Sequence, residues 1–256
     1  MISTTEIASA EIASDKPIHE RLLYAYVVAS DKVKGDLLEI GCGEGRGMAE
    51  LQAKVKSYTA IDKIQAVIDT LSVKYPNVKF NQGNIPPLSM YADNSFDTIV
   101  TFQVIEHIKN DHLFLKEANR VLRPGGQLIL TTPNIKMTLT RNPWHIREYT
   151  VKELNDIMSK YFNTVDIQGI YGNEKVMDYY EQNKASVKRI TRFDIFGFQH
   201  WLPNALLRIP YEILNRMNRN KLMTKNESAV EDINSKDFNI KKADDQALDL
   251  FAIAVK

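Results

Sequence analysis

The sequence lacks several features that mark particular classes of protein. Its one cysteine among 256 residues, Cys42, excludes an intrachain disulfide and a cysteine-rich zinc site. The net charge is only +1, from 33 lysines and arginines against 32 aspartates and glutamates, so nucleic acid is not an expected partner. Residues 1–15 hold no lysine or arginine, although a secretory signal begins with basic residues. The uncharged stretch 195–207 is too short and too polar to span a bilayer. We therefore expect a cytoplasmic protein.

Short apolar runs alternate with amphipathic stretches along most of the chain. With 44% hydrophobic and 25% charged residues, the composition is that of a soluble globular protein. Buried strands are expected at 36–40, 57–61, 78–80, 96–102, 127–132, 164–170 and 247–255, and helices at 17–30, 48–55, 64–74, 111–122 and 151–161. This alternation predicts one α/β domain over residues 1–256, with an N-terminal helical segment at 1–30, a parallel sheet and helices on both of its faces.

The pattern breaks between the last two expected strands. Residues 173–243 contain no convincing strand, and we interpret them as a helical insertion, or lid. Within it, 195–225 combines aromatic and apolar residues with an excess of basic ones. Such a segment could lie on an anionic membrane surface or close over an apolar acceptor. The alternative is a helix that packs on the core with an exposed basic face.

A glycine-rich loop follows the first expected strand. Gly41 and Gly43 stand at a strand-to-helix junction, where small residues let the backbone approach a ligand closely. Asp62 ends the second strand, where a carboxylate can accept hydrogen bonds from both ribose hydroxyls. A dinucleotide fingerprint would need a third glycine where Arg46 stands, which disfavours an NAD-dependent oxidoreductase. Glu39 instead precedes the glycines by two residues, where it suits the ammonium group of an amino acid.

The segment Glu39-Ile40-Gly41-Cys42-Gly43-Glu44-Gly45 resembles motif I of the class I S-adenosylmethionine-dependent methyltransferases. The likeness continues through 82–86, where Asn84 replaces the acid that reads the adenine amino group, and through 95–100 and 122–128. It implies a seven-stranded Rossmann-like sheet of order 3-2-1-4-5-7-6 with the last strand antiparallel. It also implies S-adenosylmethionine as the cofactor and S-adenosylhomocysteine as its product. The expected cofactor contacts are Arg21, Glu39, Gly41, Cys42, Gly43, Asp62, Lys63, Asn84, Ile85 and Gln103.

Acceptor contacts are expected after the fourth and fifth strands. Glu106 and His107 resemble the Glu-His pair of ubiquinone-type O-methyltransferases, although Gln103 replaces a further acid of that pattern, and we expect no metal. Both are candidate catalytic residues, and His145 is the preferred general base because imidazole titrates near neutral pH. Trp144, Arg147 and Tyr149 are expected to contact the substrate, by ring stacking or by pairing with an acid. Each of these groups could alternatively serve only to pack or orient its loop.

These features predict a methyltransferase whose acceptor is a small molecule, most plausibly through an oxygen atom. The acceptor could be a quinone-, lipid- or glycan-linked intermediate, since the resemblance is to quinone-pathway enzymes. A nitrogen acceptor and a non-catalytic partner subunit remain alternatives. The sequence does not indicate the oligomeric state.

Overall fold

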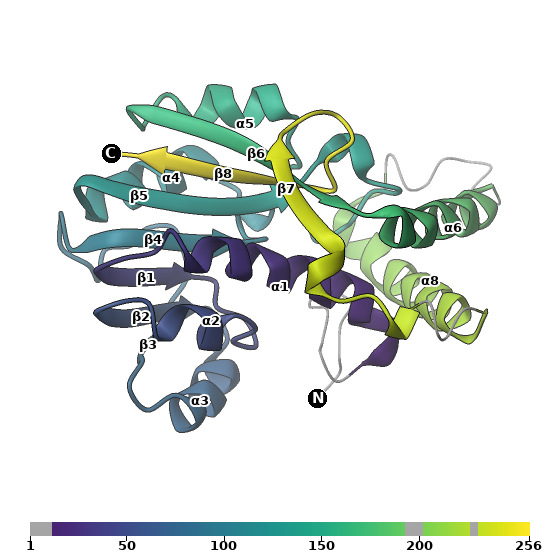
Figure 1. Ribbon diagram of the computed structural model, residues 1–256, viewed down its shortest axis with the longest axis horizontal. Coiled ribbons are helices and arrows are strands. Elements are labelled where there is room, and N and C mark those ends of the chain that lie inside the picture. The colour runs from purple at the N-terminus through teal and green to yellow at the C-terminus, as the bar shows by residue number, and fades with distance from the viewer. Residues whose placement is uncertain (1–11, 193–201, 226–229) are drawn as a thin grey trace.

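The expected strands form one sheet in the computed structural model, which describes residues 12–192, 202–225 and 230–256. The strand order is β3-β2-β1-β4-β5-β8-β6-β7 (Figure 1). The strands are β1 (Asp36–Ile40), β2 (Ser57–Asp62), β3 (Lys79–Gln82), β4 (Phe96–Phe102), β5 (Leu122–Pro133), β6 (Thr164–Gly172), β7 (Phe238–Lys242) and β8 (Asp249–Val255). Strands β1 to β5 pair in parallel, whereas β8 runs antiparallel to both β5 and β6. The expected order and the antiparallel last strand are therefore confirmed.

Strand β7 corrects the prediction that 173–243 contains no strand. It adds an eighth, edge strand by pairing antiparallel with β6. Phe238 is buried in it and Ile240 partly buried, while Asn239, Lys241 and Lys242 are exposed. An edge strand with one solvated face needs only this weak alternation, which a search for continuous apolar runs does not detect.

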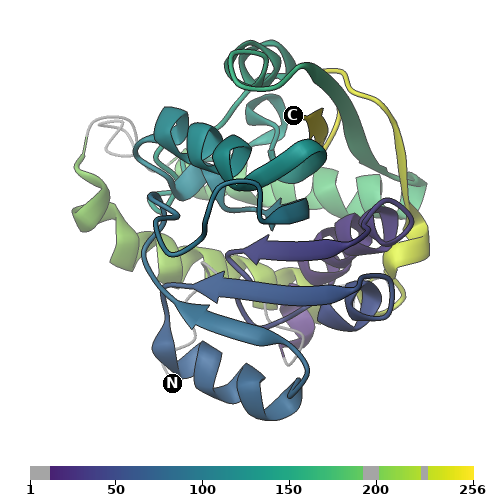
Figure 2. The ribbon, with the colours of Figure 1, turned by 90° about the vertical axis from the view of Figure 1, so that its left-hand side faces the viewer.

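Helices cover both faces of the sheet. One face packs against α4 (Asp111–Val121) and α5 (Val151–Met158), and the other against α1 (Lys16–Ser30), α2 (Met48–Gln52) and α3 (Gln65–Lys74). Strand β1 contributes to both cores, with Leu37 facing one and Leu38 the other, because successive side chains of a strand alternate. Figure 2 shows the same layers from the side. None of the helices in the described ranges combines the length and the apolar character needed to cross a bilayer.

The segment after β6 is largely helical, as expected. It contains α6 (Glu174–Thr191) and α8 (Asn204–Lys225), which contact each other, followed by a short 3-10 turn (Ser235–Asp237) and β7. Figure 1 shows α6 and α8 beyond the end of the sheet toward which β1 and β2 point. These two helices therefore lie next to the loops that follow the carboxyl ends of the parallel strands.

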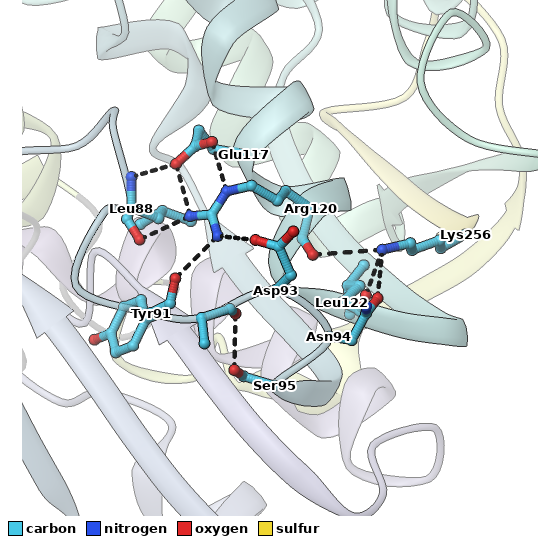
Figure 3. Close-up of polar contacts among 10 residues, drawn as sticks. Leu88, Tyr91, Asp93, Asn94, Ser95, Glu117, Arg120, Leu122 and Lys256 are labelled. Atoms are coloured by element: carbon cyan, nitrogen blue, oxygen red, sulfur yellow. Dashed lines mark hydrogen bonds and ion pairs between the residues drawn. The ribbon is translucent and has the colours of Figure 1, made fainter.

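A charged cluster ties together the opposite end of the sheet, where β4 and β5 begin (Figure 3). Arg120, near the end of α4, donates to both carboxylate oxygens of Glu117, to Asp93, and to the carbonyls of Leu88 and Tyr91. We call these five residues the Arg120 cluster. Its acceptors all receive hydrogen bonds from one guanidinium group, so it fixes the loop before β4 to α4.

Candidate active site

The glycine loop after β1 forms one wall of a cavity of about 260 Å³ at the carboxyl ends of the parallel strands. Gly41 has φ +77°, and a Cβ atom there would lie 2.4 Å from Val104 Cγ2, so no larger residue fits this turn. Predicted cofactor contacts that line this cavity are Gly41, Cys42, Gly43, Asp62, Lys63, Asn84, Ile85 and Gln103. The structure thus brings together residues from four separate segments of the sequence.

Asp62 is held in a fixed orientation at the end of β2. Its two carboxylate oxygens accept hydrogen bonds from the backbone N–H groups of Gly43 and Ile64, each at 3.0 Å. Only 8% of the residue is exposed, and it lines the cavity. A carboxylate oriented in this way can still accept hydrogen bonds from the hydroxyls of a ribose.

Glu39 lies beneath this loop and not among the residues that line the cavity. Its carboxylate accepts hydrogen bonds from the hydroxyls of Tyr26, at 2.8 Å, and Tyr58, at 2.6 Å. Burial raises the pKa of Glu39, and the two tyrosine hydrogen bonds oppose that shift. Tyr26 does line the cavity, so Glu39 is connected to the cavity wall by its hydrogen bond with the Tyr26 hydroxyl. The direct contact expected between Glu39 and the cofactor stays a prediction.

Cys42 packs in the loop as a small apolar residue. It is 2% exposed, and burial raises the pKa of its thiol. A thiol that stays protonated is a poor nucleophile, so the side chain contributes shape to the cavity and not reactivity.

A second cavity, of about 270 Å³, adjoins the first. Leu22, Gln103 and His107 line both of them. Gln103 has φ +57°, an uncommon conformation for a residue other than glycine, and its N–H donates to the carbonyl of Thr131. The loop after β4 is thereby held at the junction of the two cavities.

The wall of the second cavity includes residues that the sequence did not single out. Tyr179 and Tyr180 come from α6, and Tyr211, Asn215 and Arg219 come from α8. The sequence predicted a helical insertion here, but nothing in it showed which side chains would face the cavity. The segment expected to be a lid thus contributes part of this cavity.

Arg21 lines the second cavity and not the first. Its Nε lies 3.0 Å from Oδ2 of Asp249, which is 1% exposed at the start of β8. Burial raises the pKa of Asp249, and the charge of Arg21 opposes that shift. The expected contact of Arg21 with the cofactor stays a prediction, and Asp249 is a site residue that the sequence analysis missed.

Glu106 is fully buried beside the second cavity. One carboxylate oxygen accepts from the Thr132 hydroxyl at 3.0 Å, and Oε1 has no hydrogen-bond partner among the described residues. Burial raises its pKa to about 7, against the opposing charge of His145. A carboxyl group of this kind can exchange a proton near neutral pH.

Two histidines stand edge to face in the same region, with ring centroids 4.9 Å apart. Nδ1 of His107 lies 2.9 Å from the carbonyl oxygen of Trp144. Since a carbonyl only accepts, Nδ1 of the neutral ring carries the proton, and Nε2 is its basic nitrogen. His145 bridges Glu148, 2.5 Å from Nδ1, and Asn142, 2.8 Å from Nε2. Both histidines line the second cavity, but only His107 also lines the first.

Glu106, His107 and His145 are also the described residues that could hold a metal ion together. One ligand atom from each lies within 4.8 Å of the other two. The expectation that no metal is used stays a prediction.

The structure places the three expected substrate contacts away from both cavities. Tyr149 is 1% exposed and donates its hydroxyl hydrogen bond to Asp111 at 2.8 Å. Arg147 pairs with the same carboxylate at 2.7 Å. The indole N–H of Trp144 donates to Glu212 at 2.9 Å. These side chains hold their loop to neighbouring helices, and the substrate contacts expected for them stay a prediction.

Comparisons with known proteins agree with this geometry. A methyltransferase domain family matches residues 38–130. A probable S-adenosylmethionine-dependent methyltransferase of Mycolicibacterium smegmatis is 35% identical over 53% of this chain and 55% of its own length. A ubiquinone biosynthesis O-methyltransferase of Rickettsia akari is 33% identical over 40% of this chain and 41% of its own. The chain thus spans about half the length of the curated relatives it matches.

Among solved structures, a possible histamine N-methyltransferase of Thermotoga maritima superposes with a TM-score of 0.57. The match covers 93% of this chain and 91% of that chain at 16% identity. At this identity the likeness concerns the fold alone, including the segment after β6.

Proposed function

Because the chain carries a class I S-adenosylmethionine-dependent methyltransferase domain, we propose that it transfers a methyl group to an oxygen atom of a small molecule. The observation that carries this proposal is the pair of adjoining cavities with Leu22, Gln103 and His107 at their junction. A donor in one cavity and an acceptor in the other would meet where these three side chains stand. Alignment of two bound reactants is the main requirement of such a displacement.

The first cavity fits the donor. When bound, S-adenosylmethionine supplies a methyl group on a positively charged sulfur. Asp62 would hold its ribose hydroxyls, and the tight turn at Gly41 lets the backbone approach it. Asn84 lines the same cavity and would accept from the adenine amino group through its side-chain oxygen.

In the second cavity, His107 would take the proton of the acceptor hydroxyl. Its Nδ1 is oriented by the carbonyl of Trp144, which leaves Nε2 as the basic nitrogen. Oxygen is favoured as the acceptor atom by this base and by the likeness to ubiquinone biosynthesis O-methyltransferases. Tyr179, Tyr180 and Tyr211 in the wall of the second cavity suit a ring, as in a quinone-, lipid- or glycan-linked intermediate.

An amine acceptor is the second candidate. The buried Oε1 of Glu106 has no partner among the described residues, and it could accept a hydrogen bond from a neutral amine and stabilise the positive charge that develops on the nitrogen as the methyl group is transferred. In that case the buried carboxylate, and not a histidine base, would set the selectivity.

The test begins with calorimetry of S-adenosylmethionine and S-adenosylhomocysteine binding to the wild-type protein and to Asp62→Ala. We expect binding that weakens about tenfold or more in the variant, because two charge-assisted hydrogen bonds are lost. Absence of heat with either compound would overturn the assignment.

Transfer is tested by incubating the protein with methyl-labelled S-adenosylmethionine and small-molecule extracts, followed by mass spectrometry of labelled products. A labelled ether supports the oxygen acceptor, and a labelled amine supports the second candidate. Binding without any labelled product would instead indicate a non-catalytic subunit.

A further inference from the structure

Helix α8 presents two chemically different faces. Tyr211, Asn215 and Arg219 face the second cavity. On the other side, four apolar residues are exposed, namely Leu206 (63%), Ile209 (70%), Ile213 (55%) and Met217 (62%). They follow one another at intervals of three or four residues, so they form a single stripe along the helix. We call them the outer stripe of α8.

The outer stripe is a concentration of apolar surface. Among the eleven large hydrophobic residues that are exposed in the described part of the chain, five belong to α8, namely the outer stripe and Leu214. Single exposed apolar residues are ordinary, whereas contiguous ones mark a surface that binds something. Packing within the molecule does not account for the stripe, because the opposite face of α8 lines the second cavity.

The charges around the stripe are positive. Helix α8 contains five basic residues and one acid, Glu212, which accepts the hydrogen bond of the Trp144 indole. Arg216 and Arg219 pair with the buried Asp15, whereas Lys221 is exposed. Arg208 lies on the cavity side of the helix, where its guanidinium group stands 4.0 Å from the centre of the Trp144 ring.

The neighbouring helix adds to this positive charge. Helix α6, which contacts α8, carries exposed Lys188 and Arg189 in its last turn, and exposed Arg192 follows directly. Figure 1 shows the two helices side by side at one end of the molecule. An apolar stripe flanked by cations is the pattern of a helix that lies in the interface of an anionic membrane.

We propose that the outer stripe of α8 docks this protein on the surface of an anionic lipid membrane. The apolar side chains would enter the acyl boundary, and Lys221 would contact lipid phosphates. A second copy of the chain fits less well, because a two-fold contact through the stripe would bring two basic helices together. The part of the predicted membrane segment at 195–201 lies outside the described residues, so the proposal rests on α8 and α6 alone.

Docking through this face would place the second cavity next to the membrane, because one helix serves both. An acceptor with an apolar tail could then reach the cavity without crossing water. The docking itself does not depend on the proposed function.

The test is sedimentation of the full chain with vesicles of phosphatidylcholine alone or mixed with phosphatidylglycerol. We expect pelleting with the mixed vesicles that decreases at high salt, and little with the neutral ones. The variant Ile209→Gln/Ile213→Gln should bind the mixed vesicles about tenfold or more weakly, because its apolar insertion is lost. Lys221→Gln should weaken binding about fivefold through the loss of one cation.

The matched control is Val73→Gln. Val73 is 84% exposed on α3, outside α6 and α8, and its replacement should leave vesicle binding unchanged. All substituted side chains are exposed, so circular dichroism should show folded variants. Wild-type protein that stays in the supernatant with mixed vesicles overturns the proposal, as does equal pelleting of the double variant. A concentration-dependent dimer in light scattering that the double variant abolishes would instead assign the stripe to a second copy.

Discussion

Two clusters of charged residues in this protein differ in how completely their carboxylates are hydrogen-bonded. In the Arg120 cluster, one guanidinium group satisfies two carboxylates and two carbonyls at the rim of the sheet. At the other end, Glu106 and Asp249 are both buried; Asp249 is ion-paired with Arg21, and Oε1 of Glu106 has no hydrogen-bond partner among the described residues. We call these two carboxyl groups, together with His107 and His145, the site cluster.

This difference indicates that the Arg120 cluster stabilises the fold, whereas the site cluster is suited to proton transfer. A satisfied ion network stabilises a fold, whereas a buried polar atom without a partner costs free energy unless a ligand or a proton compensates it. The pKa of Glu117 is lowered by its hydrogen bonds with Arg120, and the pKa of Glu106 is raised to about 7 by burial. Glu117 therefore stays charged near neutral pH, whereas Glu106 changes its protonation there.

The largest expected effect is on turnover in the site cluster. His107→Ala should lower kcat about 100-fold or more, because the proposed base at the junction of the cavities is lost. Binding of S-adenosylhomocysteine should change little. His145→Ala should cause a smaller loss, since His145 lines only the second cavity. The reverse order, with the greater loss in His145→Ala, would make His145 the base, as the sequence alone predicts.

The next effect is on the stability of the Arg120 cluster. Arg120→Ala should reduce the free energy of unfolding by about 2–3 kcal/mol, because several buried or half-buried acceptors lose their donor. Denaturant titration measures this difference. Arg123→Ala, which removes a more exposed arginine with partners Asp36 and Asp97, serves as the control and should cost less than Arg120→Ala. Equal losses in the two variants would contradict the central role of Arg120.

The smallest effect concerns pH, and it has opposite signs in the two clusters. A raised folded pKa means that Glu106 binds its proton more tightly in the folded state, so its contribution to stability falls as pH rises from about 4.5 to about 7. The lowered pKa of Glu117 contributes stability above its unfolded value that is lost in acid.

Glu106→Gln should therefore stabilise the protein at pH 8 and do so less at pH 5, where the folded-state carboxyl is protonated. Thermal unfolding at the two pH values measures the difference. The matched control is Glu117→Gln, which should destabilise the protein at pH 8. A Glu106→Gln gain that is the same at both pH values would show that the carboxyl does not titrate as inferred.

Most of the predicted cofactor contacts come together in the first cavity, because the lining of that cavity depends on local structure. Parallel pairing of β1 and β2 brings the ends of both strands to the same edge of the sheet. It thereby fixes the position of the turn at Gly41 relative to the acid that ends β2. The eight cofactor contacts that line the first cavity all follow a strand or lie in the glycine loop. Their positions can be predicted without knowing how segments distant in the sequence pack together.

The acceptor side could not be predicted in the same way. Whether Tyr149 faces a cavity or the core depends on where Asp111 lies, 38 residues away in sequence. Tyr179 and Tyr211 reach the second cavity only because α6 and α8 pack at the end of the sheet. Asp249 looks like an ordinary strand start, and its meeting with Arg21 depends on β8 inserting beside β5.

The position of β8 also constrains how the chain is made. Strand β6 pairs with β8 and β7 but not with β5, so β6 and β7 can join the sheet only after residues 249–255 have left the ribosome. Until then β5 has an open edge, and Arg21 has no Asp249 to meet. Strands β1 to β5 are therefore all synthesised well before the sheet can be completed on the far side of β5.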